Sequence, residues 1–165
     1  NFECLLPCDI KNSVKNTHKI FKPVGSPLIF IEREKFLKLK GFDKNFFLYY
    51  EDIDIQQRML NNNKNIYRVN IVFKHLYGSH NKKFNHEISV NRNWHYMWSR
   101  FYFLKKNNSY LYALFSTILT CLRSLMRLLF YFFLNKNKYY IYKGRFLGLI
   151  NSYFKKKSWY RPNIK

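Results

Sequence analysis

Three carboxylates stand close together in the middle of a chain that contains few acids. The 165 residues include 30 Lys and Arg but only 9 Asp and Glu, and Glu51, Asp52 and Asp54 fall within one short segment. An ionised carboxylate beside a hydroxyl can act as a general base. The simpler alternative is a helix start with solvated acids.

Helical spacing follows the acids, at Ile53, Gln56, Gln57 and Leu60. The acids are therefore expected in the first turn of a helix, which ends near Leu60 at an Asn-rich break. Free N–H groups and the helix dipole favour ionised carboxylates at that position. This environment would keep a base such as Asp52 charged at neutral pH.

The segments before the acids are expected to position them. Val24–Ile31 reads as a turn at Gly25 and Ser26, followed by a short buried strand. A short helix over 32–39 then leads to a turn at Gly41, and the aromatic run 46–50 reads as a buried extended segment. Small side chains at Gly25 and Ser26 would let a ligand approach the backbone closely. A tight turn without any ligand is an equal alternative.

The longest motif runs from Gly41-Phe42-Asp43 through Phe46-Phe47-Leu48-Tyr49-Tyr50-Glu51-Asp52-Ile53-Asp54 to Arg58. It resembles the acceptor-side motif of inverting family 2 glycosyltransferases of the GT-A fold, including rhamnosyltransferase-like members. In that family a small-residue turn, a strand and a short helix precede Gly-Phe-Asp in the same order. The turn is usually Gly-Ala where this chain has Gly25-Ser26. The resemblance covers about residues 24–106, with weaker support to the end.

The resemblance implies roles for individual residues. Asp52 would be the catalytic base, and Glu51 would orient the site or the acceptor. His75 would complete a divalent metal site for Mn²⁺ or Mg²⁺, a role suited to imidazole beside carboxylates. The main metal ligands, an Asp-x-Asp motif, belong to the nucleotide-binding half of the family, which this sequence does not contain. A lone His after a strand is otherwise more often structural.

Further substrate-binding candidates are Gly25, Ser26, Asp54 and Arg100. Asp54 also stands one helical turn before Arg58, a spacing that favours a structural ion pair. Arg100 lies in a helical stretch, 93–106, that resembles the helix following the metal His in the family. Arg92, Lys105 and Lys106 share that stretch or adjoin it, and each could meet a phosphate or simply form a solvated basic face.

The most hydrophobic stretch, 109–134, is long enough to cross a bilayer. Arg123 and Arg127 interrupt it, and arginines at the bilayer midplane are costly. We therefore expect a helix lying in the membrane interface, with a true span or packing against the catalytic domain as alternatives. A mixed helix follows after Tyr139, and 155–157 is a Lys cluster beside aromatic residues that suits an anionic membrane surface.

The net charge of +21 favours an anionic partner, although AT-rich codons would also enrich the chain in Lys, Asn, Ile, Phe and Tyr. Three cysteines at Cys4, Cys8 and Cys121 have no zinc-like spacing and are expected to be reduced thiols. No signal peptide is recognised at the start of the sequence, and the sequence starts at Asn1 without an initiator Met, as a fragment of a longer chain would.

These observations predict an α/β protein: the C-terminal, acceptor-side half of a GT-A glycosyltransferase domain over 1–85, followed by basic, amphipathic, membrane-associating helices over 86–165. The expected function is sugar transfer, with inversion, from a nucleotide-sugar donor to a glycan or lipid-linked acceptor in cell-envelope polysaccharide synthesis. We expect peripheral attachment to an anionic surface, the cytoplasmic face of the cell membrane, and no nucleic acid partner. The alternative is a non-enzymatic basic module that binds membrane or nucleic acid.

Overall fold

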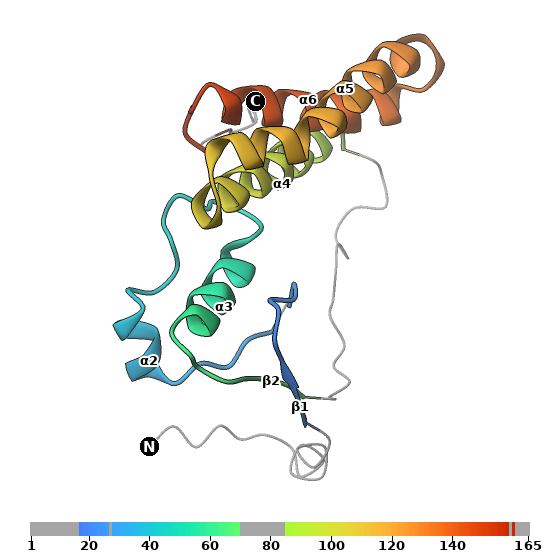
Figure 1. The fold of residues 1–165 in the computed structure, drawn as a ribbon. Coiled ribbons are helices and arrows are strands. Elements are labelled where there is room, and N and C mark those ends of the chain that lie inside the picture. Colours follow the sequence, from blue (N-terminus) through green and yellow to red (C-terminus); the bar gives the residue numbers. More distant parts are fainter. Residues whose placement is uncertain (1–16, 27, 70–84, 159, 161–165) are drawn as a thin grey trace.

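Three long helices lie side by side and form the largest part of the structure (Figure 1). They are α4 (His86–Asn107), α5 (Tyr110–Leu134) and α6 (Lys136–Tyr153). The computed structural model of the chain describes residues 17–26, 28–69, 85–158 and 160. Short links join the three helices, so α5 runs antiparallel to both of its neighbours, and α4 and α6 end on the same side of the bundle.

Each of the three helices begins at a polar cap. The side chains of Asn85, Ser109 and Asn135 each accept a hydrogen bond from the backbone N–H three residues later. Such caps satisfy N–H groups that have no partner within the helix. Asn135 also ends α5, so one residue separates two helices and forces the chain to reverse there.

Two glycines bring α6 into backbone contact with α4. A methyl group at Gly144 would lie 2.5 Å from the Val90 carbonyl oxygen, and one at Gly148 would overlap the Trp94 carbonyl oxygen. The two glycines are four residues apart and therefore share one face of α6. No larger side chain fits at either position without separating the helices.

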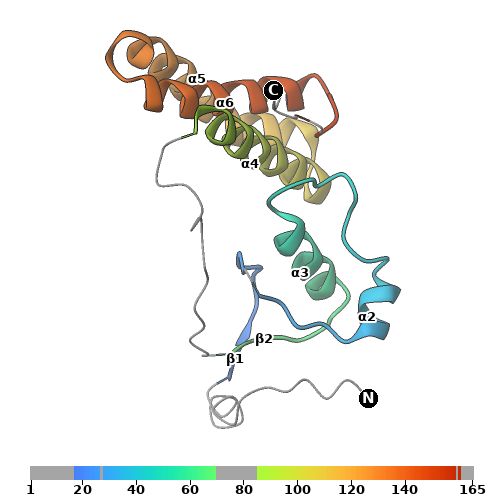
Figure 2. The ribbon, with the colours of Figure 1, turned by 180° about the vertical axis from the view of Figure 1, so that it is seen from behind.

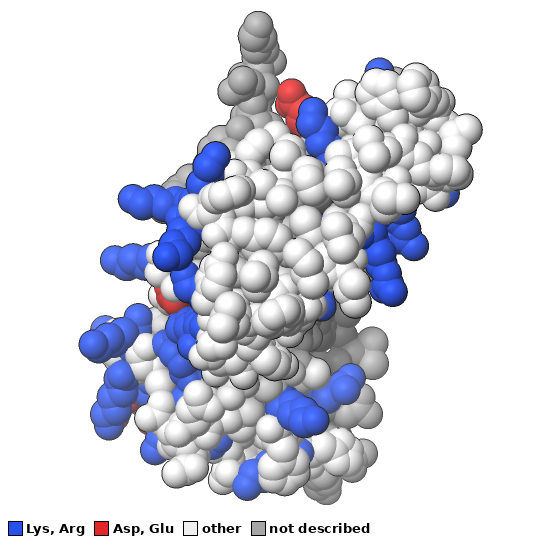
Figure 3. Space-filling view, turned by 45° about the horizontal axis from the view of Figure 1, so that its top comes forward, with Lys and Arg blue, Asp and Glu red and all other residues white. Residues whose placement is uncertain are grey.

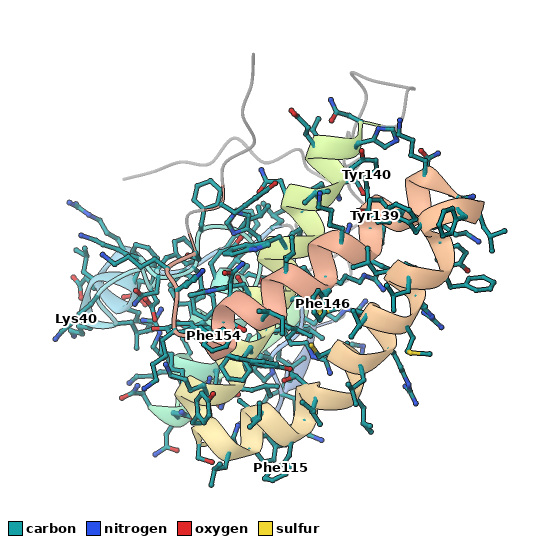
Figure 4. All side chains as sticks on the ribbon, turned by 90° about the horizontal axis from the view of Figure 1, so that it is seen from above. Lys40, Phe115, Tyr139, Tyr140, Phe146 and Phe154 are labelled. Atoms are coloured by element: carbon teal, nitrogen blue, oxygen red, sulfur yellow. The ribbon has the colours of Figure 1, made fainter. Side chains whose placement is uncertain are left out.

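A small apolar core lies between the three helices. Its buried members are Met97, Phe101, Ala113, Cys121 and Leu149. Cys121 is buried, as expected for a reduced thiol, and burial raises its pKa. Phe146 packs against this core between α6 and α5 (Figure 4).

The first part of the chain packs beneath the bundle (Figures 1 and 2). It contains β1 (Thr17–Ile20), α2 (Arg33–Lys38), α3 (Glu51–Asn61) and β2 (Ile66–Val69). β1 and β2 pair antiparallel, with Thr17 opposite Val69 and Ile20 opposite Ile66. Most of the side chains on both strands are exposed.

The predicted α/β fold class, an acceptor-side half of a GT-A domain, is wrong. Helices hold 65% of the described residues, and the strands found there form one small two-stranded sheet. The expected strand over 28–31 does not form, and its side chains Leu28 and Phe30 are 46% and 68% exposed. An apolar run of four residues becomes a buried strand only where a sheet exists to cover it, and the described residues provide no such sheet.

The helix predictions are confirmed at α2, α3, α4, α5 and α6. β2 forms over the β-branched and aromatic run Ile66–Val69, whereas β1 lies in a polar, basic stretch. The turn at Gly41 is confirmed and has a φ of 66°. The aromatic run before α3 is bent rather than extended, and this bend shapes the candidate site.

Candidate functional site

The backbone turns sharply just before the acids of α3. Tyr49 has a φ of 68° and Tyr50 a φ of 71°, so two consecutive aromatic residues are left-handed. Such conformations cost non-glycine residues about 1–3 kcal/mol each and persist only where surrounding contacts enforce them. Tyr50 is the N-cap of α3, so this corner sets the direction in which Glu51 and Asp52 leave the loop.

One face of α4 holds this corner in place. Arg92 Nε donates a hydrogen bond of 3.0 Å to the Tyr49 hydroxyl. One turn further along α4, the Tyr96 ring contacts the rings of both Tyr49 and Tyr50, at centroid distances of 5.6 and 5.8 Å. Ser99 Oγ then donates to the Leu48 carbonyl at 2.9 Å. The strained backbone is thus fixed by side chains spaced three or four residues apart.

Asp52 is oriented by the small-residue turn that the sequence singled out. Its Oδ2 accepts a hydrogen bond of 2.7 Å from the Ser26 backbone N–H, and a methyl group at Gly25 would lie 3.8 Å from the same oxygen. Gln56, one turn along α3, exchanges two hydrogen bonds with the Val24 backbone, at 2.7 and 3.1 Å. The turn and the start of α3 therefore form one unit, although 26 residues separate Ser26 from Asp52.

The carboxyl group of Glu51 is less well hydrogen-bonded than that of the adjacent Asp52. Its Oε2 is buried and makes no hydrogen bond within the described residues. Burial raises the pKa of the Glu51 carboxyl, and the charge of Asp52 raises it further, against the opposing effect of its own backbone N–H. Glu51 therefore holds a proton more readily than an ordinary glutamate, while its neighbour is directly hydrogen-bonded by a backbone N–H.

Tyr50 connects the acids with Arg100 of α4. Burial raises the pKa of the Tyr50 hydroxyl, and the nearby Tyr96 and Asp52 raise it further. The positive charge of Arg100 acts in the opposite direction, so this guanidinium lies within electrostatic reach of the Tyr50 hydroxyl. Among the described residues, no carboxylate forms an ion pair with Arg100. Its charge is therefore available next to the acidic corner.

Asp54 points away from this corner and is part of the scaffold. Its side chain is fully buried, with Oδ2 2.8 Å from Arg58 Nε and Oδ1 2.6 Å from Lys106 Nζ. Lys106 also binds Asp43 at 2.7 Å, and it helps to lower the pKa of that carboxyl against the opposing effect of burial. Arg58 donates further to the Leu39 and Gly41 carbonyls. The predicted Asp54–Arg58 pair is present, and both Asp54 oxygens are occupied.

The predicted metal site depends on His75. His75 lies outside the described residues. Within the residues that the structure does describe, no three His, Cys, Asp or Glu side chains converge on a common point. Glu51 and Asp52 are adjacent, but Asp54 is already bound by two cations. A third ligand would have to come from another part of the protein.

The second candidate site is the outer face of α5. Its large apolar side chains recur every three or four residues and are 51–89% exposed: Leu111, Phe115, Leu119, Leu122, Met126, Leu129, Phe130 and Phe133. The opposite, buried face carries small residues: Ala113, Thr117, Cys121 and Ser124. Figure 4 shows Phe115 on the outer side of α5, away from α6. This arrangement is the reverse of a water-soluble helix and resembles helix packing in membranes, where small residues face inward.

α5 is long and apolar enough to associate with a membrane. Figure 3 shows a broad uncharged surface with Lys and Arg gathered mainly around its margins. Arg123 and Arg127 lie beside the apolar stripe rather than in its centre, given 100° of rotation per residue. Arg127 donates to the Tyr142 hydroxyl at 2.9 Å and lies over that ring, which holds the guanidinium against α6.

Comparison of the chain with protein-family models, with curated proteins and with solved structures gave no match.

The structure therefore joins Gly25 and Ser26 to Asp52, which follows Glu51, and Arg100 lies within electrostatic reach of the neighbouring Tyr50. Asp54 is bound by Arg58 and Lys106 instead. Sequence reasoning missed the aromatic corner formed by Tyr49, Tyr50 and Tyr96. A signal for it was available on α4, where positions 92, 96, 99, 100 and 103 fall on one helical face. Four of these positions hold Arg or an aromatic residue.

Proposed function

We propose that this chain supplies the acceptor-side catalytic residues and the membrane-binding helices of an inverting glycosyltransferase. The observation that carries the proposal is the gathering of Asp52, Glu51, the Gly25–Ser26 turn and Arg100 at one strained corner. Strained backbone held by many contacts is typical of functional sites. The long motif over 41–58 gives this corner its chemical interpretation.

In the proposed reaction Asp52 is the general base. Its carboxylate accepts the proton of the acceptor hydroxyl while the hydroxyl oxygen forms a bond to the anomeric carbon of the donor sugar. The bond from that carbon to the nucleoside diphosphate breaks on the opposite face, which inverts the configuration. The Ser26 N–H binds Oδ2 of Asp52, so the proposal assigns the proton transfer to the other carboxylate oxygen.

Glu51 and Arg100 have supporting roles in this proposal. The raised pKa of Glu51 makes it a hydrogen-bond donor to an acceptor oxygen over part of the pH range. Arg100, which lies near the Tyr50 hydroxyl, suits an anionic substrate group. A divalent Mn²⁺ or Mg²⁺ ion would stabilise the departing diphosphate. Its ligands would be His75 and residues outside this sequence.

The proposed place of action is the cytoplasmic face of the cell membrane, where nucleotide sugars are available. The exposed stripe of α5 supports peripheral attachment there, and the lysine-rich margins suit anionic lipid. A lipid-linked glycan at that surface is the acceptor that fits both features.

A second candidate, a non-enzymatic membrane-binding module, is favoured by one specific observation. The reversed polarity of α5 and the basic surface would bind a bilayer without any chemistry at α3. This candidate leaves the strained Tyr49–Tyr50 corner and the oriented Asp52 without a role.

The decisive experiment replaces Asp52 by Asn in the longest polypeptide that the coding frame encodes. Release of nucleoside diphosphate from a panel of nucleotide sugars is measured on membranes of the source cell. General-base catalysis contributes about 10²–10⁴-fold, so Asp52→Asn should reduce transfer by that factor while the circular dichroism spectrum stays unchanged. The matched control is Glu34→Gln, an equal loss of charge at an exposed site on α2.

Near-normal turnover of Asp52→Asn would remove this residue as the base. If the unmodified protein transfers no sugar from any donor yet binds vesicles, the membrane-binding module becomes the better account.

A further inference from the structure

A small basic cavity lies where α4 and α6 end. Its volume is about 130 Å³, and its lining includes Lys105, Lys155, Lys156, Lys157, Asn45 and Ser158. Four of its lining side chains are lysines, and none is acidic. Pockets for drug-sized ligands usually measure about 300–1,000 Å³. This cavity therefore suits a small anion rather than a whole nucleotide sugar.

The lysines of the cavity have charges that are not neutralised within the described residues. None of the four has a carboxylate within ion-pair distance there. Lys106 provides the contrast, because it follows Lys105 directly in the chain yet binds both Asp43 and Asp54. Because four lysines line one small cavity, an anion bound there would be attracted by the charges of all four.

The backbone that carries three of these lysines is held in place. Lys155 is left-handed, with a φ of 56°, and turns the chain back at the end of α6. Trp98 Nε1 of α4 donates to the Lys156 carbonyl at 2.8 Å, and Ser158 Oγ donates to the Asn45 carbonyl at 2.5 Å. The lysines therefore extend from a fixed loop, which lowers the entropy lost when they bind a common anion.

Apolar surface adjoins the cavity. Phe154, which directly precedes the lysine run, is 73% exposed. The Tyr110 hydroxyl at the start of α5 donates to the Tyr153 carbonyl at 3.3 Å, so the apolar stripe of α5 begins beside this end of α6. Figure 4 shows Phe154 and Phe115 at this end of the bundle. A ligand here would meet ammonium groups and hydrocarbon-binding side chains together.

We propose that this cavity binds the phosphate group of a lipid at the membrane surface, with the lipid chains alongside Phe154 and the first turns of α5. The phosphate is held by the four lysines at the margin of the apolar stripe. The role of this lipid as the sugar acceptor rests on the proposed function, whereas the binding itself does not.

The test uses vesicles of phosphatidylcholine with phosphatidic acid, which carries a phosphomonoester, or with enough phosphatidylserine to give the same zeta potential. Cosedimentation of the unmodified chain should show at least about fivefold tighter binding to the phosphatidic acid vesicles. In Lys155→Gln/Lys156→Gln/Lys157→Gln this preference should fall to about one. These three side chains are exposed, so the variant should retain its fold.

The matched control, Arg123→Gln/Lys136→Gln/Lys138→Gln, removes three exposed charges away from the cavity. Each cation near an anionic surface contributes about 1 kcal/mol, so both triple variants should bind all anionic vesicles more weakly. The control variant should nevertheless keep its preference for phosphatidic acid. Equal binding of the unmodified chain to both vesicle types, or a preserved preference in the cavity variant, would overturn the proposal.

A separate arm measures free inorganic phosphate and pyrophosphate by calorimetry. The proposal expects binding that is at least tenfold weaker than to phosphatidic acid vesicles, because the free anions lack the apolar contacts. Equally tight binding of the free anions would contradict a lipid ligand. Asp52→Asn should keep the lipid preference, so failure of sugar transfer and failure of lipid binding can be distinguished.

Discussion

The two helices α3 and α5 bury opposite kinds of side chain within one chain. α3 buries a charged residue, Asp54, and surrounds it with Arg58 and Lys106. α5 buries small residues such as Ala113 and Thr117 and turns its large apolar side chains outward. α3 follows the rule for proteins in water, where buried charges are paired. α5 follows the rule for helices in contact with lipid.

This difference shows that α4 separates two environments. Its face with Arg92, Tyr96 and Ser99 holds the acidic corner through hydrogen bonds and ring contacts. Its other face packs against α5 and α6 and carries the apolar core. Under the proposed function, one face of α4 would position the water-soluble donor while the other would support the helix that contacts lipid.

The largest expected effect on the difference between α3 and α5 comes from making the outer face of α5 polar. Phe115→Ser/Leu122→Ser/Met126→Ser removes three exposed side chains, each contributing about 1.5–3 kcal/mol when fully buried in an apolar phase. We expect vesicle binding to weaken by more than 100-fold and the thermal unfolding transition in water to stay in place. Vesicle flotation and a thermal scan measure the two effects.

The matched control for this prediction is Phe21→Ser/Phe30→Ser/Leu37→Ser. These side chains are 60–77% exposed but belong to the first part of the chain. Their replacement should leave vesicle binding unchanged. An equal loss of binding in both variants would show that α5 has no special role.

The second prediction concerns the buried charge of α3. Asp54→Ala should lower the free energy of unfolding by about 3–5 kcal/mol, because it leaves Arg58 and Lys106 without their shared partner. Chemical denaturation measures this loss. The matched control is Glu32→Ala, which breaks the exposed pair with Lys35. A comparable loss of unfolding free energy in the two variants would mean that the buried Asp54 ion pairs contribute no more to stability than an exposed pair.

The third prediction concerns the close packing of α6 on α4. Gly148→Ala should destabilise the fold by about 1–3 kcal/mol, although Ala is the better helix former, because its methyl group would overlap the Trp94 carbonyl oxygen. Gly25→Ala is the control, since its methyl group would meet only an ordinary contact at 3.8 Å. A Gly148→Ala protein as stable as the unmodified chain would contradict the packing described.

The smallest expected effect tests the environment of Glu51. Its folded-state pKa is raised by burial, so the protonated form is favoured in the fold and ionisation destabilises the fold as pH rises above the ordinary value of 4.5. Glu51→Gln should therefore be more stable than the unmodified chain at pH 7 and equally stable below pH 4.5. Thermal scans across this range measure the difference, and a constant offset at all pH values would contradict it.

The sequence predicted individual helices and one ion pair more accurately than it predicted the fold class. Residues at helical spacing located α3, and a long hydrophobic stretch located α5. An i, i+4 pair of opposite charges located the Asp54–Arg58 contact. Lys106, the other partner of Asp54, is 52 positions further along the chain, so no local pattern could reveal it. The fold class failed because a short apolar run is equally compatible with a strand and with an exposed loop.

The candidate site was predicted in part for similar reasons. The Gly25–Ser26 turn and Asp52 were singled out as separate motifs, and the structure joins them through one backbone hydrogen bond. The left-handed pair Tyr49–Tyr50 could not be predicted, because intrinsic preferences of bulky residues oppose that conformation. Contacts from α4, far along the chain, hold it in place.

The apolar stripe of α5 has a consequence for how reaction rates depend on concentration. It follows one face of α5 from Leu111 to Phe133, about 33 Å at 1.5 Å per residue, and a one-sided stripe suits the proposed attachment with the helix lying flat in the surface. A protein held in this way searches for lipid partners in two dimensions. The rate of the proposed sugar transfer should then follow the mole fraction of the acceptor lipid in the bilayer rather than its amount per volume. Adding neutral lipid to the same vesicle suspension would therefore slow the reaction without removing any acceptor.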